Sequence, residues 1–448
     1  MVAAQAPEAE RRLDILLLCD QRDDIAATVS DHIEALAEGS RHRVLKASMF
    51  GYLSEKIDLD RFDALVVHYT LVACSDDYIG PESRARIAAF PGLKAAFVQD
   101  EYRHVNRTVA ALRDLGVGVL FTCVPEPEIE KVYPRAKLPG VRKVNLLTGY
   151  VPPGLADRPA PAFAERPIDV GYRARPLPAW LGELGQEKHR IAVRFAADAD
   201  RWGLRVDISD REEDRLYGDA WTRFLCRSKA VLGTESGASV FDFEGDIQAR
   251  VEAHLRRDPG ASFETLRDLY FAAAEGRMRL NQISPRCFEA ACLRCLMILY
   301  EGAYSGVLEP WRHYVPLAKD HGNMAEVVAV LRDPARAQAI VDAAYREIAR
   351  DPAYSYAPMV ATFDRTMSAA FAPAMARGRE AYSDAAFARD RRSRRSIYRQ
   401  WRRRAIEAAY RRVTGAIRAI LPAAAQPVAL RAIKAVVAAL RRLRRRAA

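Results

Sequence analysis

Short apolar runs alternate with amphipathic helix patterns through the first 150 residues, and this alternation limits the fold more than any other sequence feature. The runs are rich in Val, Ile and Leu, which is typical of strands that are buried on both faces. The expected strands are LDILLLCD, HRVLKASM, DALVVHYT, LKAAFVQD, VGVLFTCV and KVNLLTGYV. Because helical patterns such as DDIAATVSDHIEALAEG separate them, the sequence predicts a parallel, doubly wound α/β sheet.

The same alternation resumes after a proline-rich segment. The stretch GYVPPGLADRPAPAFAERP holds five prolines in 19 residues and predicts a linker. Beyond it, PIDVGYRAR, SKAVLGTE and CLMILYEG are expected strands, while LGQEKHRIAVRFAADADRWG and SPRCFEAACLR are expected helices. The second half of the chain therefore predicts another α/β domain.

These patterns divide the chain into six parts. We expect a disordered N-terminus at 1–12, a first α/β domain at 13–150, a linker at 151–167, a second α/β domain at 168–340, crossover helices at 341–374 and a helical tail at 375–448.

The tail carries the positive charge of the chain. From Arg377 to the end there are 21 Lys and Arg against 4 Asp and Glu, a net of +17, whereas the remainder holds 48 basic and 54 acidic residues, a net of −6. The segment VALRAIKAVVAALRRLRRR predicts a basic amphipathic helix, and we expect it to attach weakly to an anionic membrane surface. The alternative is a solvated helical extension. Nucleic acid is the less favoured partner because no recognised binding module accompanies the charge.

The N-terminal segment MVAAQAPEAERR lacks the apolar core of a secretory signal, and no apolar run approaches the roughly 18 residues of a membrane span. We therefore expect a cytoplasmic protein, peripheral at most at the inner face of the plasma membrane. The seven cysteines are scattered through apolar segments, which indicates free thiols. The C-x4-C-x2-C spacing lacks the four converging ligands of a zinc site, and no metal site is expected.

Polar residues stand where several expected strands end, at the edge where doubly wound sheets bind ligands. They are Asp20, Gln21, His68, Tyr69, Gln99, Asp100 and Glu101. In VQDEYRHVNR, Asp100 and His104 are candidate general bases. A structural role at the start of a helix is the alternative for His104.

The segment ISPRCFEAACLR predicts a helix with Ser284 as N-cap and Pro285 at its first position. Free backbone N–H groups at this end, beside Arg286, are suited to a phosphate. Glu289 can accept hydrogen bonds from two neighbouring hydroxyls, such as those of a ribose. The alternative is an ion pair between Arg286 and Glu289 on a capped helix.

Cations also gather around PIDVGYRAR, an expected strand that ends in a glycine turn at Gly171. Arg173 and Arg175 follow it, and Lys188 and His189 lie in the next helix, an arrangement that suits a diphosphate. The alternative is a solvated charged surface.

Two further carboxylates stand at strand ends. In GTESGASV, Glu235 precedes Ser236 and Gly237, small residues that let a ligand approach the backbone. Glu301 closes CLMILYE before a glycine, a position well suited to meet a ligand, and it is the third candidate catalytic residue. An ordinary loop and a capped turn, respectively, are the alternatives.

Together these blocks resemble a known family. ISPRCFEAACLRCLMILYEGAYSG, followed by WRHYVPLAKDHGNMAEVVAVLRD, resembles the C-terminal signature of GT-B glycosyltransferases, and most closely the group-1/CgeB-like bacterial type. The matching positions are Arg286, Phe288, Glu289, Ala290, Tyr314, Leu317, Asp320 and Asn323. QDEY, GYRARPLPAW and GTESGASVFDF are similar to further blocks of that subgroup, and the resemblance covers residues 13–372.

The resemblance implies two Rossmann-like domains facing a cleft, with a nucleotide-sugar donor on the second domain and a glycan, lipid-linked or protein acceptor on the first. It implies that Glu289 binds the donor's ribose and that Arg173, Lys188 and Arg286 neutralise the diphosphate. No cofactor or metal is expected, because the nucleotide-diphosphate sugar is a substrate. Related retaining enzymes carry a glutamate eight residues before the ribose-binding one, and here that position is Asn281, so the stereochemistry stays open.

The expected function is therefore sugar transfer of the hexosyltransferase type, as in polysaccharide biosynthesis. A nucleotide-sugar 2-epimerase of the same fold is the first alternative. A non-catalytic binding protein recruited to a membrane by its tail is the second.

Overall fold

The computed structural model describes residues 11–22, 26–372, 375, 380–421, 429, 432 and 433. The expected disordered N-terminus and the expected amphipathic helix in VALRAIKAVVAALRRLRRR lie largely outside these residues.

The first domain is a six-stranded sheet in which every neighbouring pair is parallel, with the strand order β2-β1-β3-β4-β5-β6. Its strands are β1 (Asp14–Cys19), β2 (Arg43–Ser48), β3 (Ala64–Val67), β4 (Leu93–Val98), β5 (Val119–Thr122) and β6 (Arg142–Asn145). The intervening helices are α1 (Ala27–Gly39), α2 (Pro81–Ala89), α3 (Val105–Leu115) and α4 (Glu126–Val132). All six predicted strands are confirmed. The apolar runs of β1, β3, β4 and β5 fill the middle of the sheet, which is covered on both faces, whereas β2 and β6 lie at its two edges and are less buried.

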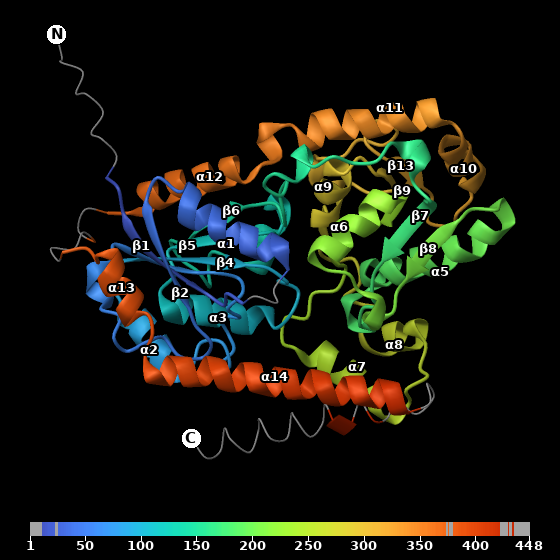
Figure 1. Cartoon of the computed structure of the whole chain (residues 1–448). Coiled ribbons are helices and arrows are strands. Elements are labelled where there is room, and N and C mark those ends of the chain that lie inside the picture. Colours follow the sequence, from blue (N-terminus) through green and yellow to red (C-terminus); the bar gives the residue numbers. More distant parts are fainter. Residues whose placement is uncertain are drawn as a thin grey trace, which may run out of the picture.

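The second domain is a five-stranded parallel sheet with the order β13-β12-β9-β7-β8. Its strands are β7 (Ile168–Arg173), β8 (Val206–Ser209), β9 (Ser228–Gly233), β12 (Leu296–Tyr300) and β13 (Val315–Leu317). Its helices include α5 (Glu183–Trp202), α6 (Gly218–Arg227), α9 (Pro285–Cys292), α10 (Met324–Arg332) and α11 (Pro334–Ala344). The architecture is thus α/β with two Rossmann-like domains, as expected (Figure 1).

An insertion in the second domain, residues 236–282, faces the first domain. An antiparallel pair, β10 (Ser236–Ala238) and β11 (Leu280–Gln282), encloses helices α7 (Asp246–Arg257) and α8 (Phe263–Tyr270). The backbone N–H of Asp242 donates to the carbonyl of Tyr102 at 2.8 Å, and that of Asn106 donates to the carbonyl of Phe243 at 3.0 Å. These contacts join the insertion to the loop between β4 and α3 and to the first turn of α3.

The chain then returns to the first domain. Helix α12 (Tyr356–Ala370) lies against the first sheet, where Phe363 packs on Phe97 and Phe121 with ring centroids 6.0 and 5.7 Å apart (Figure 1). Met359 and Met367 belong to the same buried cluster. The crossover therefore completes the core of the first domain with residues from the far end of the chain.

Part of the basic tail also packs on the first domain, which the sequence patterns do not predict. Helices α13 (Asp384–Asp390) and α14 (Arg394–Ile420) run along it (Figure 1). Tyr382 and Phe387 are buried in its core, and Arg403 bonds the carboxylate of Asp20 at 2.6 Å. None of the helices in the described ranges is long and apolar enough to cross a membrane.

The linker is fixed to the second domain by a buried arginine. Arg166 is 1% exposed, and its guanidinium donates to the carbonyls of Ser228 at 2.9 Å and Leu293 at 2.8 Å, and to that of Pro161. It therefore satisfies backbone acceptors that have no access to water.

Replacing Arg166 by Leu should lower the free energy of unfolding by about 3 kcal/mol or more, because several buried carbonyls lose their donor. Thermal and urea unfolding measure this change. Arg158→Leu is the control: Arg158 is exposed and pairs with Asp219 at 3.5 Å, a surface ion pair that contributes little. Equal midpoints for the two variants would contradict the assignment.

Candidate functional site

A cavity of about 470 Å³ lies at the carboxyl ends of β7 and β9, between the second domain and the loop that follows β4. Five basic side chains and one carboxylate line it, together with small and aromatic residues. The basic residues are Arg103, Arg175, Lys188, Arg215 and Arg286, and the carboxylate is Asp100. The cavity is therefore strongly electropositive and suited to an anionic ligand.

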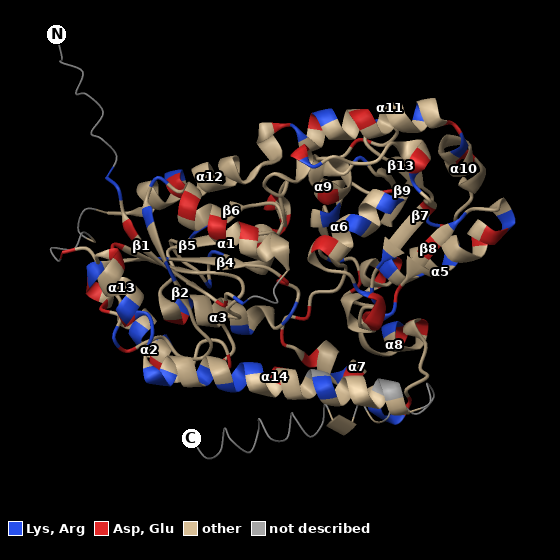
Figure 2. Ribbon diagram, in the orientation of Figure 1, with Lys and Arg blue, Asp and Glu red and all other residues tan. Residues whose placement is uncertain are grey.

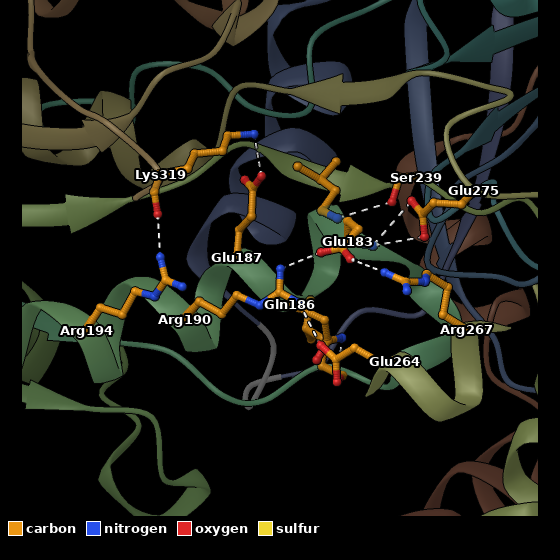
Figure 3. Close-up of polar contacts among 12 residues, drawn as sticks. Glu183, Gln186, Glu187, Arg190, Arg194, Ser239, Glu264, Arg267, Glu275 and Lys319 are labelled. Atoms are coloured by element: carbon orange, nitrogen blue, oxygen red, sulfur yellow. Dashed lines mark hydrogen bonds and ion pairs between the residues drawn. The ribbon is translucent and has the colours of Figure 1, made fainter. Parts of the chain in front are cut away.

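Helix α5 holds Lys188 in place through polar contacts on its other sides. The carboxylate of Glu275 accepts the backbone N–H of Glu183 at 3.2 Å, which satisfies the first turn of the helix (Figure 3). Glu187, one residue before Lys188, binds Lys319 at 2.5 Å (Figure 3). The start of α5 is thus occupied by the protein's own carboxylate, and α5 contributes a side chain to the cavity.

Lys188 is the cation with the most perturbed environment. Its ammonium lies 3.4 Å from the hydroxyl of Ser236. Its pKa is lowered to about 8: loss of hydration is the largest cause, the nearby Arg286 adds to the lowering, and Asp100 opposes it. An anion bound beside Lys188 would stabilise the protonated form.

The N-terminus of α9 also faces the cavity. Ser284 occupies the N-cap position with Pro285 after it, as predicted, but its hydroxyl makes no capping hydrogen bond. Arg286 stacks on Trp221 at 4.9 Å and donates a hydrogen bond to the backbone carbonyl of Arg173. The guanidinium is therefore fixed at the cavity wall beside a free hydroxyl.

Two glycines are required by close packing. The expected turn at Gly171 is wrong: the residue lies inside β7, where a Cβ would come within 2.5 Å of the Ser228 hydroxyl oxygen and 2.7 Å of the Phe224 ring. Gly237 has φ +118°, which side-chain-bearing residues rarely adopt. Both line the cavity, where they leave room for a ligand near the backbone.

Asp100 comes from the first domain. It has φ 56°, a left-handed conformation, and accepts a hydrogen bond from the Tyr102 hydroxyl at 2.9 Å. The next residue, Glu101, is buried and accepts hydrogen bonds from the Tyr133 hydroxyl and the Cys123 N–H, each at 2.7 Å, and from Thr122. Glu101 thus anchors the turn that presents Asp100 to the cavity.

Three predicted donor-binding residues do not line this cavity. Arg173 pairs with Asp207 at 2.7 Å and stacks on Phe224. Glu235 accepts the side-chain amide of Asn281 at 2.7 Å and the N–H of Tyr304 at 2.8 Å, so it ties the end of β9 to the loop after β12.

Glu289 is the third predicted donor-binding residue that does not line the cavity. It accepts the indole N–H of Trp221 at 2.8 Å, and Trp221 is the residue that lines the cavity. Burial raises the pKa of Glu289, whereas the Trp221 hydrogen bond lowers it by a smaller amount.

The other two predicted catalytic residues, His104 and Glu301, also lie outside the cavity. His104 has φ 47° at the start of α3, and its buried Nδ1 has no hydrogen-bond partner among the described residues. Glu301 is exposed after β12. At the edge of the first sheet, His68 is fully buried and bonds His32 at 3.0 Å, while Asp20 is held by Arg403.

The cavity therefore brings together seven of the twelve predicted site residues. They are Asp100, Gly171, Lys188, Ser236, Gly237, Ser284 and Arg286. Sequence reasoning missed its aromatic walls and two arginines: Tyr102, Tyr172, Trp180, Trp221, Arg103 and Arg215. Trp221 lies in α6 within a pattern typical of any amphipathic helix, so no sequence signal indicates its role.

Among the described residues, no group of three or more His, Cys, Asp or Glu is placed to hold a metal ion. Of the C-x4-C-x2-C cysteines, Cys287 borders the cavity, and burial raises its pKa to about 12. Cys295 lies 3.2 Å from the guanidinium of Arg166.

Comparisons with known proteins found only distant structural similarities. No family model and no curated protein matches the chain. Among solved structures, an alpha-glucosyltransferase in complex with UDP and a 13-mer DNA matches at 7% identity, over 80% of this chain and 100% of that chain, with a TM-score of 0.46.

Anabaena Alr3699/HepE in complex with UDP matches at 9% identity, over 80% of this chain and 100% of that chain, with a TM-score of 0.43. TarM matches at 10% identity, over 68% of this chain and 54% of that chain, with a TM-score of 0.38. All three scores are below 0.5.

Glu101→Gln should change how stability depends on pH. Burial raises the pKa of Glu101 to about 7, above its unfolded value, so the folded state retains this proton more strongly. Its contribution to stability is fully present at low pH and is lost as pH rises through about 7. Relative to wild type, Glu101→Gln should gain thermal stability between pH 5.5 and 8, as measured by the unfolding midpoint. Glu130→Gln, at an exposed position, is the control, and parallel curves for Glu101→Gln and wild type would contradict the shift.

Proposed function

We propose that this protein is a glycosyltransferase that moves a sugar from a nucleoside-diphosphate sugar to an acceptor hydroxyl. The observation that carries the proposal is the cavity between the two domains, where five cations, small residues at strand ends and aromatic walls surround one carboxylate. A diphosphate needs cations and backbone approach, whereas a nucleoside needs a flat, partly apolar surface. The cavity supplies both within one volume.

The diphosphate is expected to lie against Lys188, Arg286 and the Ser284 hydroxyl. These groups come from two helices, α5 and α9, and all three line the cavity. Ser236 and Gly237 lie next to them and permit close approach to the backbone. The ring system is expected at Trp221, whose indole is already oriented by Glu289. In this arrangement Glu289 acts either on the ribose or through Trp221.

Transfer breaks the bond between the anomeric carbon and the phosphate oxygen, and forms a bond from that carbon to the acceptor oxygen. The leaving diphosphate gains negative charge, which Lys188 and Arg286 are placed to stabilise. Asp100, presented from the opposite domain, is the proposed acceptor of the hydroxyl proton. We propose that the protein's own cations supply this stabilisation without a metal ion.

Lys188→Met should weaken the binding of nucleoside diphosphates by about tenfold or more, because a charge-assisted hydrogen bond is lost. UDP, GDP, ADP and dTDP are screened by thermal shift, since a true ligand stabilises the fold by mass action, and the best is measured by calorimetry. Arg194→Met is the control, because Arg194 lies on the same helix but contacts the backbone carbonyl of Lys319 (Figure 3).

The pH dependence of diphosphate binding provides a second test of the role of Lys188. Because the pKa of Lys188 is about 8 in the free protein, affinity should fall as pH rises above 8 in wild type. The fall should be reduced in Lys188→Met. If none of the diphosphates stabilises the wild-type protein, the proposal is wrong.

Asp100→Asn should abolish transfer while leaving diphosphate binding nearly unchanged, since the substitution removes the proton acceptor but retains the shape. The assay supplies nucleotide sugars with and without candidate acceptors and follows diphosphate release and donor epimerisation separately. Glu301→Gln, at an exposed carboxylate outside the cavity, is the control. Epimerised donor in the absence of acceptor would favour the 2-epimerase. Binding without any turnover would favour a non-catalytic role.

A further inference from the structure

Helix α14 has one face fixed to the first domain. Gln400 donates to the carbonyl of Ser48 at 2.9 Å, and Arg403 bonds Asp20 and stacks on Phe50 at 3.6 Å. Nearer the start of the helix, Arg395 bonds Glu82 at 2.9 Å. Because these contacts recur at helical spacing, the rotation of α14 about its axis is set by the domain.

The opposite face of α14 exposes large apolar side chains. Ile397 is 51% exposed, Tyr398 is 56% exposed and Trp401 is 61% exposed, and the rings of Tyr398 and Trp401 stack with centroids 6.1 Å apart. Positions 394, 397, 398, 401, 404 and 412 fall on one side of a helix with 3.6 residues per turn. We call this side the outer face of α14.

The outer face is also basic. Arg394, Arg404 and Arg412 are exposed on it, between and beyond the aromatic residues. The whole helix holds nine arginines and one glutamate, and that glutamate, Glu407, turns toward the domain to bond Arg22 and Arg403. Figure 2 shows basic residues along α14. No acidic residue of α14 is therefore left to offset the charge of the outer face.

From this geometry we propose that the outer face of α14 is a docking surface for an anionic lipid bilayer, with Ile397, Tyr398 and Trp401 at the lipid interface and the arginines on the headgroups. Tryptophan and tyrosine favour the interface between headgroups and acyl chains, and arginine is attracted to anionic headgroups. An exposed isoleucine beside them gains by leaving water. Nucleic acid would use the arginines but would gain little from Ile397, so the lipid surface is the better match.

This attachment is distinct from the proposed reaction, because the outer face lies outside the cavity. It also differs from attachment through the last 27 residues, since it places the contact on a helix whose orientation is fixed. The bilayer would therefore meet the protein on one defined side. An interface of a few aromatic and basic side chains should bind weakly and lose affinity as salt rises.

The test is co-flotation of the full chain with vesicles of phosphatidylcholine alone or with 30% phosphatidylglycerol, at low and high salt. The bound fraction should require the anionic lipid and should fall at least fivefold in Ile397→Ser combined with Trp401→Ser. The matched control is Val193→Ser, because Val193 is 52% exposed on α5 in the other domain. Unfolding midpoints of all variants should match wild type, since the changed side chains lie on the surface.

Three outcomes would overturn the proposal. The first is equal flotation of wild type and the double variant, which would assign any binding to another part of the tail. The second is flotation that is indifferent to anionic lipid. The third is that wild type binds no lipid but binds a fluorescent single-stranded RNA or DNA, and that the double variant loses this binding. That result would identify a nucleic-acid surface. Diphosphate binding should be the same in all variants, so failure here is distinguishable from failure of the transferase proposal.

Discussion

The confinement of like charges around Lys188 is the constraint on which the site depends. The Lys188 ammonium has little hydration and stands near the guanidinium of Arg286; the loss of hydration, followed by this repulsion, lowers the pKa of Lys188 to about 8. Such an arrangement persists only because packing and hydrogen bonds elsewhere hold it. The polar contacts of α5 with Glu275 and Lys319, and the stacking of Arg286 on Trp221, supply that support. A bound anion relieves the repulsion, so the free protein is prepared for a negative ligand before it arrives.

The same site depends on contacts between the two domains. Asp100 meets the cations of the second domain because the loop after β4 is bonded to the segment that leads into α7. On the other side, the Thr148 hydroxyl donates to the carbonyl of Ile283 at 2.5 Å, just before α9. A Cβ on Gly149 would collide with Pro285, so the end of the first domain and the start of α9 are in close contact. These contacts hold the candidate base, from the first domain, and the cations of the second domain in one cavity.

The sequence predicted the architecture well because buried parallel strands leave a strong local pattern. Four of the six strands of the first sheet are such runs, whereas β2 and β6 at its two edges are only partly buried or exposed. The strands that the sequence did not predict are short or polar: VDIS of β8 is only partly buried, and β10, β11 and β13 are three residues each. The site was harder to predict, because roles there depend on which partner a side chain finds. Arg173 finds Asp207, whereas Arg175, two residues later, lines the cavity. Nothing in the local sequence Arg-Ala-Arg at residues 173–175 distinguishes the two arginines. Asn281 lies in β11 and donates its side-chain amide to Glu235, which lies in the loop between β9 and β10.

The docking of the tail also has a consequence for the integrity of the first sheet. Strand β2 is at its margin, where unpaired backbone groups can recruit strands from other molecules. Tail residues cover this margin: Asp384 pairs with Arg43 at 2.5 Å, and the side-chain amide of Gln400 donates a hydrogen bond to the carbonyl of Ser48, the last residue of β2. A nascent chain exposes this edge until residues 384–400 have been synthesised. A chain shortened before α13 would leave the edge of β2 open to pairing with other molecules, and it would also lose Phe387 from the core of the first domain.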